Sequence, residues 1–421
     1  MLPSDALLPV LLAVPAVMLA CHAGGWAIRR IGQPPVIGEI LVGILLGPSL
    51  LGWVAPDLQH RLLPSSVLPV ISILGNLALL MFLFVIGAEL DLGGLRENRR
   101  AVLGVSLGSM LLPLALGSLL ALAMYPYLAP AGVHRLPFVL FVAVSMSITA
   151  FPVLARILSD RNLESTYLGT FVMACAAAND AAAWCLLTAV VALCTAATPL
   201  SALAAAGLTL ALAVTLIVLR PALHALLRRA EQRSDDLVLV ILCAGLCLSA
   251  YVTDHIGIHP ALGAFLFGAT IPSKMAAVER STERIRSVFV PILLPLYFAD
   301  TGLHTDLHHL PAGQWGWAVL VLIVAIVGKW GGAAGAARLT GGDWRWSATV
   351  GTLMNCRGVT ELVVLGIGRQ IGVISPPLFT ILVLMAVLTT AATAPALTRL
   401  GYRSPVPALG VAVRQERLGD S

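Results

Sequence analysis

The chain has 421 residues, of which 58% are hydrophobic and 11% are charged, and its mean hydropathy is +0.93. These values exclude an ordinary soluble domain and predict an all-α polytopic membrane protein that lies in a lipid bilayer. The formal net charge is +5, but the basic residues are scattered singly between apolar segments, so the sequence does not predict nucleic acid as a partner.

Apolar segments long enough to cross a bilayer predict about 13 transmembrane helices. They lie at 8–28, 34–52, 67–89, 101–124, 136–158, 167–192, 200–222, 235–253, 259–275, 287–303, 315–337, 346–368 and 376–398. No short basic segment with a small-residue cleavage site precedes the first of them, so we expect that helix to be retained.

The basic residues alternate between the two sides of the predicted membrane. Of the 26 lysines and arginines, 21 follow odd-numbered helices or lie in the C-terminal tail, and 3 follow even-numbered helices. The positive-inside rule therefore places the N-terminus outside and the C-terminus in the cytoplasm, as in a multi-pass protein of the plasma membrane.

Two consecutive predicted helices of the first half match two of the second half in their prolines, glycines and aspartates. The matched pairs are Pro35 with Pro260, Gly38 with Gly263, Gly43 with Gly268, Gly87 with Gly302 and Asp91 with Asp306. This pattern predicts two six-helix repeats, helices 1–6 and 8–13, joined by a linker helix and loop at 200–236. Because the linker contributes one helix, the second repeat enters the membrane from the opposite side and is inverted.

Asp180 lies in the middle of the predicted span at 167–192, after Asn179 and among alanines. A carboxylate at that depth costs roughly 2.5–3.5 kcal/mol on insertion scales and usually marks an ion or proton site. The alternative is that Asp180 pairs with a distant cation and only fixes helix packing.

Two predicted helices carry sequences at which a membrane helix can unwind. The span at 136–158 contains Thr149 three residues before a mid-span proline, and the matching span at 346–368 contains Arg357, a glycine and Glu361. Paired helix breaks at corresponding positions of two repeats indicate a transporter's midplane site. The simpler alternative is one proline kink and one Arg357–Glu361 pair along an intact helix.

Two further charged residues lie within predicted spans. Lys329 is one of only two lysines beside 24 arginines, and a buried lysine can lose its proton whereas arginine effectively cannot. It is predicted either to carry a proton or to act as a fixed countercharge to Asp180. Glu39 either lines a cytoplasmic path or hydrogen-bonds a neighbouring helix, and the second interpretation is favoured.

The spans contain no pattern of an enzyme. No nucleophile with a nearby base and no H-E-x-x-H spacing occurs in them, and the seven cysteines lack the spacing of a metal site. The sequence therefore predicts no catalytic residue and no cofactor.

Four segments resemble the monovalent cation:proton antiporter-2 family, which includes Kef-type potassium/proton and Nap-type sodium/proton exchangers. They are Gly32 to Pro48, Phe84 to Leu92, Asn179-Asp180 and Asn355 to Val363. The resemblance implies antiport of Na+ or K+ against H+ by a homodimer. It also implies a transport domain over 1–400, in which helices 1–3 and 8–10 form the dimer scaffold and helices 4–6 and 11–13 form a core that moves like an elevator and carries crossed broken helices. Residues 401–421 are expected to form a short cytoplasmic tail.

The resemblance also implies roles for single residues. Asp180 matches the carboxylate that binds the cation or the proton, Lys329 the buried lysine beside it, Thr149 the first broken helix, and Arg357 with Glu361 the second. Asn179 replaces the first of the two aspartates found in many sodium exchangers, which favours electroneutral exchange. The alternative to antiport is a sodium-coupled symporter of organic solutes with a similar inverted-repeat fold.

Overall fold

The computed structural model describes residues 4–89, 99–161, 163, 166–195, 199–256, 260–272, 275–305 and 311–401, and all regular structure in these ranges is helical. The all-α prediction is confirmed for this part of the chain. Asp91 and Asp306 of the repeat pattern, and the predicted tail after residue 401, lie outside the described residues.

The first half of the chain forms ten helices in the described ranges. They are α1 (Ser4–Arg30), α2 (Pro35–Leu46), α3 (Leu51–Val54), α4 (Pro56–Leu62), α5 (Leu68–Glu89), α6 (Arg99–Leu128), α7 (Arg135–Ser147), α8 (Phe151–Asp160), α9 (Tyr167–Thr195) and α10 (Pro199–Glu231). The second half contains α11 (Asp235–His255), α12 (Pro260–Thr270), α13 (Ala276–Arg284), the π-helix η2 (Ile285–Phe289), α14 (Val290–Leu303), the 3₁₀ helix η3 (Ala312–Gln314), α15 (Trp315–Leu339), α16 (Trp344–Met354), α17 (Val359–Gln370) and α18 (Pro376–Leu400).

Several helices begin where the sequence carries a capping residue. Ser234, Asp343 and Ser375 each accept a hydrogen bond from the backbone N–H three residues later, at the starts of α11, α16 and α18. Such a side chain satisfies one of the four N–H groups that have no partner in the first turn. These residues therefore fix where the three helices start.

Nine described helical segments are long and apolar enough to cross a membrane. The predicted spans at 136–158 and 346–368 are not among them, because each is divided into two shorter helices, α7 with α8 and α16 with α17. The predicted span at 259–275 corresponds to the shorter apolar helix α12, and that at 200–222 to the first two thirds of α10. The count of thirteen crossings remains a prediction.

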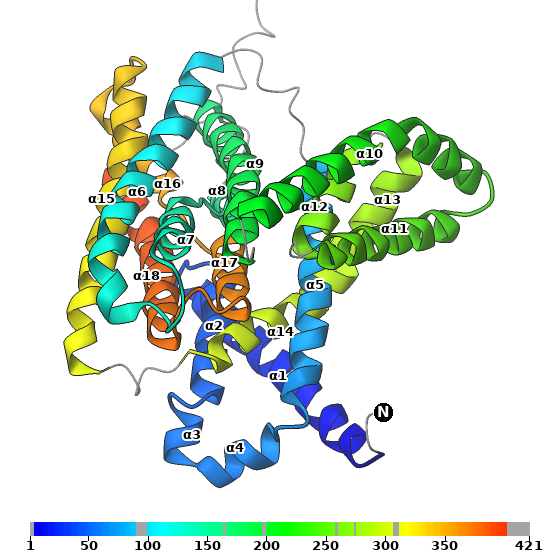
Figure 1. Cartoon of the computed structure of the whole chain (residues 1–421), viewed down its shortest axis with the longest axis horizontal. Helices are drawn as coiled ribbons and strands as arrows, with labels where there is room; N and C mark the ends of the chain where they lie inside the picture. The colour runs from blue at the N-terminus through cyan, green and yellow to red at the C-terminus, as the bar shows by residue number, and fades with distance from the viewer. Residues whose placement is uncertain are drawn as a thin grey trace, which may run out of the picture.

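The helices pack in two groups, and helices of one group contact one another far more than they contact the other group (Figure 1). One group contains α1, α2, α5 and α11 to α14; the other contains α6 to α9 and α15 to α18. Helix α10 packs against α9 of the second group and against α11 and α12 of the first. Each group thus combines helices from both halves of the chain.

Glycines at matched positions of the two halves allow two close helix crossings in the first group. A Cβ added to Gly43 of α2 would lie 2.5 Å from Ala299 O of α14, and one added to Gly268 of α12 would lie 2.2 Å from Phe84 O of α5. The two helix backbones at each crossing touch, so no larger residue fits there without displacement. The same kind of contact therefore occurs twice, each time between a helix of one half and a helix of the other.

Candidate functional site

The first helix break separates α7 from α8. Helix α7 ends at Ser147, residues 148–150 are non-helical, and α8 begins at Phe151. Pro152, the second residue of α8, occupies a position where a missing N–H costs no hydrogen bond. Thr149, fully buried, is the middle residue of the unwound segment.

The break leaves the last four carbonyls of α7 without helical partners, and side chains satisfy all four. The Ser147 hydroxyl donates to Val144 O at 2.8 Å. Arg357 donates to Met146 O at 2.6 Å and to Ser145 O at 3.5 Å, and Lys329 donates to Ser147 O. Two buried cations thus cap the negative end of the α7 dipole.

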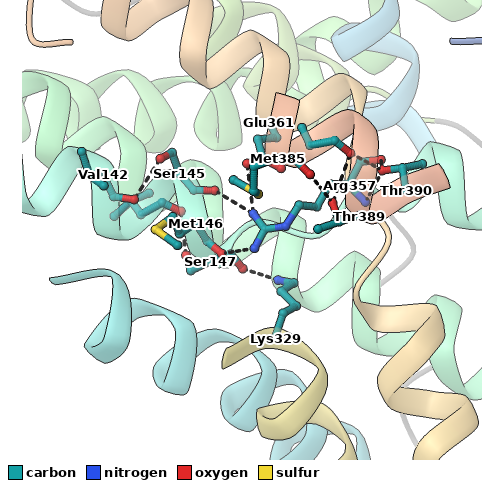
Figure 2. Close-up of polar contacts among 12 residues, drawn as sticks. Val142, Ser145, Met146, Ser147, Lys329, Arg357, Glu361, Met385, Thr389 and Thr390 are labelled. Carbon is teal, nitrogen blue, oxygen red and sulfur yellow. Dashed lines mark hydrogen bonds and ion pairs between the residues drawn. The ribbon is translucent and has the colours of Figure 1, made fainter. Parts of the chain in front are cut away.

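Arg357 and Glu361 form an ion pair that is completely buried, with Nη1 3.0 Å from Oε1. Figure 2 shows the Arg357 guanidinium between Glu361 and the end of α7, with Lys329 reaching the same end. Glu361 lies in the first turn of α17, where the helix dipole favours a negative charge. The second broken helix therefore supplies the charge that holds the first one.

The second break lies between α16 and α17, at residues 355–358, and touches the first. The backbone N–H of Ala150 donates to Cys356 O at 3.1 Å, so the two unwound segments are joined directly. Gly358 has φ 156° and ψ −123°, and a Cβ at this position would lie 2.7 Å from Cγ2 of Val153. Only glycine therefore fits at the point where the breaks meet.

Thr390 of α18 holds the second break from the other side. Its hydroxyl accepts a hydrogen bond from Arg357 N at 3.1 Å, and its proton is shared between Arg357 O and Ala386 O, each 2.7 Å away. Both backbone groups of an unwound residue are thus satisfied by one side chain, as required in a buried segment.

Asp180 lies in α9 with 1% of its surface exposed. Among the described residues neither carboxylate oxygen has a hydrogen-bond partner of ordinary geometry, although the backbone N–H of Phe151 and the Lys329 ammonium are near enough to stabilise its charge. Phe151 is the first residue of α8, so the carboxylate lies close to the positive end of a helix dipole. A buried, unpaired acid of this kind is free to take up a proton or a cation.

Asn179 connects α9 to the first break. Its Nδ2 donates to Thr149 Oγ1 at 3.1 Å and to Ser109 Oγ of α6 at 2.7 Å. Its Oδ1 is buried and has no partner among the described residues. An oxygen acceptor is therefore left next to Asp180.

Lys329 lies on α15, and its side chain is fully buried. Its hydrogen bond goes to Ser147 O and not to Asp180, whose oxygens have no such partner among the described residues. Asp180, Arg357 and Glu361 are all near enough to act on it electrostatically. The lysine is thus part of the charge cluster around the α7 end.

The structure brings six of the seven predicted site residues together and places Glu39 apart from them. Glu39 of α2 is partly buried, and its Oε1 lies 3.5 Å from the position of a Cβ on Gly25 of α1. The residues of α2 that border the Arg357 break are Val36, Ile37 and Ile40. Glu39 faces the neighbouring helix instead.

Sequence reasoning missed Ser109 and Thr390. Ser106 and Ser109 are three residues apart in one apolar span, and another apolar span contains Thr389, Thr390 and Thr393. Hydroxyl side chains grouped in this way could have indicated that both spans face a polar site. The described residues contain no group of three or more His, Cys, Asp or Glu side chains that could hold a resident metal ion.

Comparison with known sequences gives consistent matches. Residues 17–399 match the profile of the family described as sodium/hydrogen exchanger, transmembrane. The chain is 35% identical to the Na(+)/H(+) antiporter NhaS4 of Synechocystis, over 96% of this chain and 99% of that protein. It is 33% identical to the K(+)/H(+) antiporter 1 of Saccharomyces cerevisiae, over 92% of this chain but only 45% of that protein. These matches confirm the resemblance found in the sequence.

A solved structure shares the fold. The sodium proton antiporter MjNhaP1 of Methanocaldococcus jannaschii superposes with a TM-score of 0.67 and covers 94% of this chain and 100% of its own. The two sequences are 16% identical, so the likeness concerns the fold alone.

Proposed function

We propose, from the premise that the chain belongs to the transmembrane sodium/hydrogen exchanger family, that it exchanges a monovalent cation for protons at Asp180. The family consists of transporters, so the chain is not an enzyme. The single observation that carries the proposal is the buried Asp180 carboxylate, which has no hydrogen-bond partner of ordinary geometry among the described residues and lies beside an unwound helix.

The groups around Asp180 suit a dehydrated Na+ or K+. Such ions are held in transporters by side-chain oxygens, unwound backbone carbonyls and helix ends. Asp180 supplies a negative charge, Asn179 supplies an unpartnered Oδ1, and the segment around Thr149 supplies carbonyls and a hydroxyl. No covalent step is needed, because the cation and the proton compete for the same carboxylate.

The two packing groups support an elevator-type mechanism. We assign α1, α2, α5 and α11 to α14 as the scaffold of a homodimer, and α6 to α9 and α15 to α18 as the core that carries the ion. Helix α10, over most of the 200–236 linker, packs against both groups. The core moves against the scaffold and exposes Asp180 to each side in turn, while the hydrogen bonds between the two breaks keep the site intact.

An inverted repeat accounts for the matched glycine crossings. Gly43 with α14 and Gly268 with α5 are equivalent contacts if helices 1–6 and 8–13 are related by a two-fold axis in the membrane plane. On this scheme the breaks in α7–α8 and α16–α17 are also equivalent, and both lie at the midplane. The basic residues place the N-terminus outside the cell membrane and the C-terminus in the cytoplasm.

Exchange is expected to be electroneutral. Asn179 cannot ionise, and Lys329 is engaged with Ser147 O, so Asp180 is the one group at the site that changes partner. One proton then moves for one monovalent cation, and no net charge crosses the membrane.

Proteoliposomes that contain the purified chain test both points. A gradient of Na+ or K+ should drive proton movement that a pH-sensitive dye detects, while an electrode on the same membranes records no steady current. Liposomes without protein are the control. A current that scales with proton flux would show that Lys329 also exchanges its proton, and an absence of proton flux with either cation would refute antiport.

A further inference from the structure

A cavity of about 380 Å³ opens between the two packing groups, away from Asp180. Its walls are the turn between α1 and α2 on one side and the ends of α8 and α18 on the other. The volume falls within the range of small-ligand pockets, which is roughly 300–1,000 Å³.

The polar lining of this cavity is basic and contains no acidic side chain among the described residues. It comprises Arg29 at the end of α1, Gln33 in the turn and Arg161 after α8. No salt bridge joins Arg29 or Arg161 to a carboxylate among the described side chains. A cavity that a cation would enter is expected to carry the opposite charge, so this lining is suited to an anion.

The hydrogen bonds of Arg161 and Gln33 leave groups free for a ligand. Arg161 donates through Nη2 to Ala394 O at 2.8 Å and to Thr398 Oγ1 at 3.1 Å, which fixes the guanidinium at the cavity wall. Gln33 donates through Nε2 to Ala391 O at 2.9 Å, while its buried Oε1 has no partner among the described residues. The cavity thus combines two cations with an acceptor that requires a donor.

The neighbouring surface fits the headgroup level of a bilayer. Trp26 is 58% exposed, and Arg30 lies over its ring, 3.7 Å from the centroid. Tryptophan and arginine are enriched at this level, and basic pockets between helices on the cytoplasmic side attract anionic lipid headgroups.

We propose that this cavity binds the phosphate of an anionic lipid headgroup that also carries a hydroxyl, of the phosphatidylglycerol type. Arg29 and Arg161 neutralise and hydrogen-bond the phosphate, because guanidinium groups match its geometry. The headgroup hydroxyl donates to Gln33 Oε1 once the Gln33 side chain turns this buried atom toward the cavity. The lipid would lie between the α1–α2 turn and the ends of α8 and α18, two parts of the protein that the proposed function requires to move against each other. An occupied cavity therefore restrains that movement, a consequence that rests on the proposed function.

Thermal unfolding of the full-length chain in detergent tests binding without any transport measurement. Tryptophan fluorescence reports melting while phosphatidylglycerol or phosphatidylcholine is titrated into wild type, Arg29→Gln, Arg161→Gln and Arg30→Gln. Phosphatidylglycerol should raise the melting temperature of wild type and Arg30→Gln to a plateau, and the shift should fall by at least half in the other two variants. Arg30 is the matched control, because it neighbours Arg29 but does not line the cavity.

An equal shift with phosphatidylcholine, or an undiminished phosphatidylglycerol shift in Arg29→Gln, would overturn the proposal. Arg29→Gln decides the outcome even if Arg161→Gln unfolds, because no ion pair or hydrogen bond joins the Arg29 side chain to another described residue. Inorganic phosphate is a parallel titration. If it gives the full shift and phosphatidylglycerol adds nothing, the lipid is excluded as the source of the phosphate. No step of this test measures ion exchange. The lipid proposal can therefore be refuted while antiport is upheld, and antiport can be refuted while lipid binding is upheld.

Discussion

Asp180→Asn should reduce cation-driven proton flux in proteoliposomes to that of liposomes without protein. An amide has nearly the shape of the acid, but it neither releases a proton nor neutralises a dehydrated cation in a buried site. The variant should still fold, because it removes a buried carboxylate that has no hydrogen-bond partner of ordinary geometry among the described residues. Dye-monitored flux with Na+ and with K+, beside thermal unfolding of the same preparation, measures both effects.

Glu39→Gln is the matched control for that experiment. It makes the same change from acid to amide in another membrane helix, but Glu39 faces α1 and not the helix breaks. Most of the flux should remain. Normal exchange by Asp180→Asn, or equal losses in the two variants, would contradict the assignment of Asp180.

Arg357→Ala is expected to lower the free energy of unfolding by about 3–5 kcal/mol, the usual cost of leaving one partner of a buried ion pair alone. The change uncovers two carbonyls of α7 and leaves Glu361 unpaired at a fully buried position. Removing both charges, in Arg357→Ala/Glu361→Ala, should recover part of the loss, because the unpaired anion is then gone. Thermal and denaturant unfolding in detergent compare the variants.

Thr390→Val tests the hydrogen bonds to the Arg357 backbone at the same break while leaving the Arg357–Glu361 ion pair in place. It keeps the shape of the side chain but removes both hydrogen bonds to the Arg357 backbone, with an expected cost of about 1–3 kcal/mol. The order of stability should be wild type, Thr390→Val, then Arg357→Ala. If Arg357→Ala has the same melting temperature as wild type, the ion pair does not hold the two broken helices together.

The positions of both helix breaks and the burial of the charged residues could be predicted from the sequence. A proline three residues after Thr149 and a glycine next to Arg357 mark places where a helix loses backbone hydrogen bonds, and mid-span charges must be buried in protein. Hydropathy also located the long helices, because a bilayer sets a minimum length. These features depend on local sequence, which is why they could be read from it.

The hydrogen-bond partners could not be predicted in the same way. Arg357 and Lys329 donate to carbonyls of α7, which every residue possesses and which no sequence pattern distinguishes. Ser109 and Thr390 reach the site only because α6 and α18 are rotated to face it, and that rotation depends on packing. One of the two interpretations of Lys329 made it a countercharge to Asp180. Its ammonium is near enough to act on that carboxylate, but the sequence did not predict that its hydrogen bond goes to the end of α7.

The most direct test of competition at Asp180 is proton release from the purified chain on cation binding. In weakly buffered detergent solution, at a pH where Asp180 is protonated, adding Na+ or K+ to wild type should release about one proton for each cation bound, and Asp180→Asn should release none. A dye in solution reports the protons, and calorimetry counts the cations. Cation binding to wild type without proton release, or the same release from Asp180→Asn, would contradict the account.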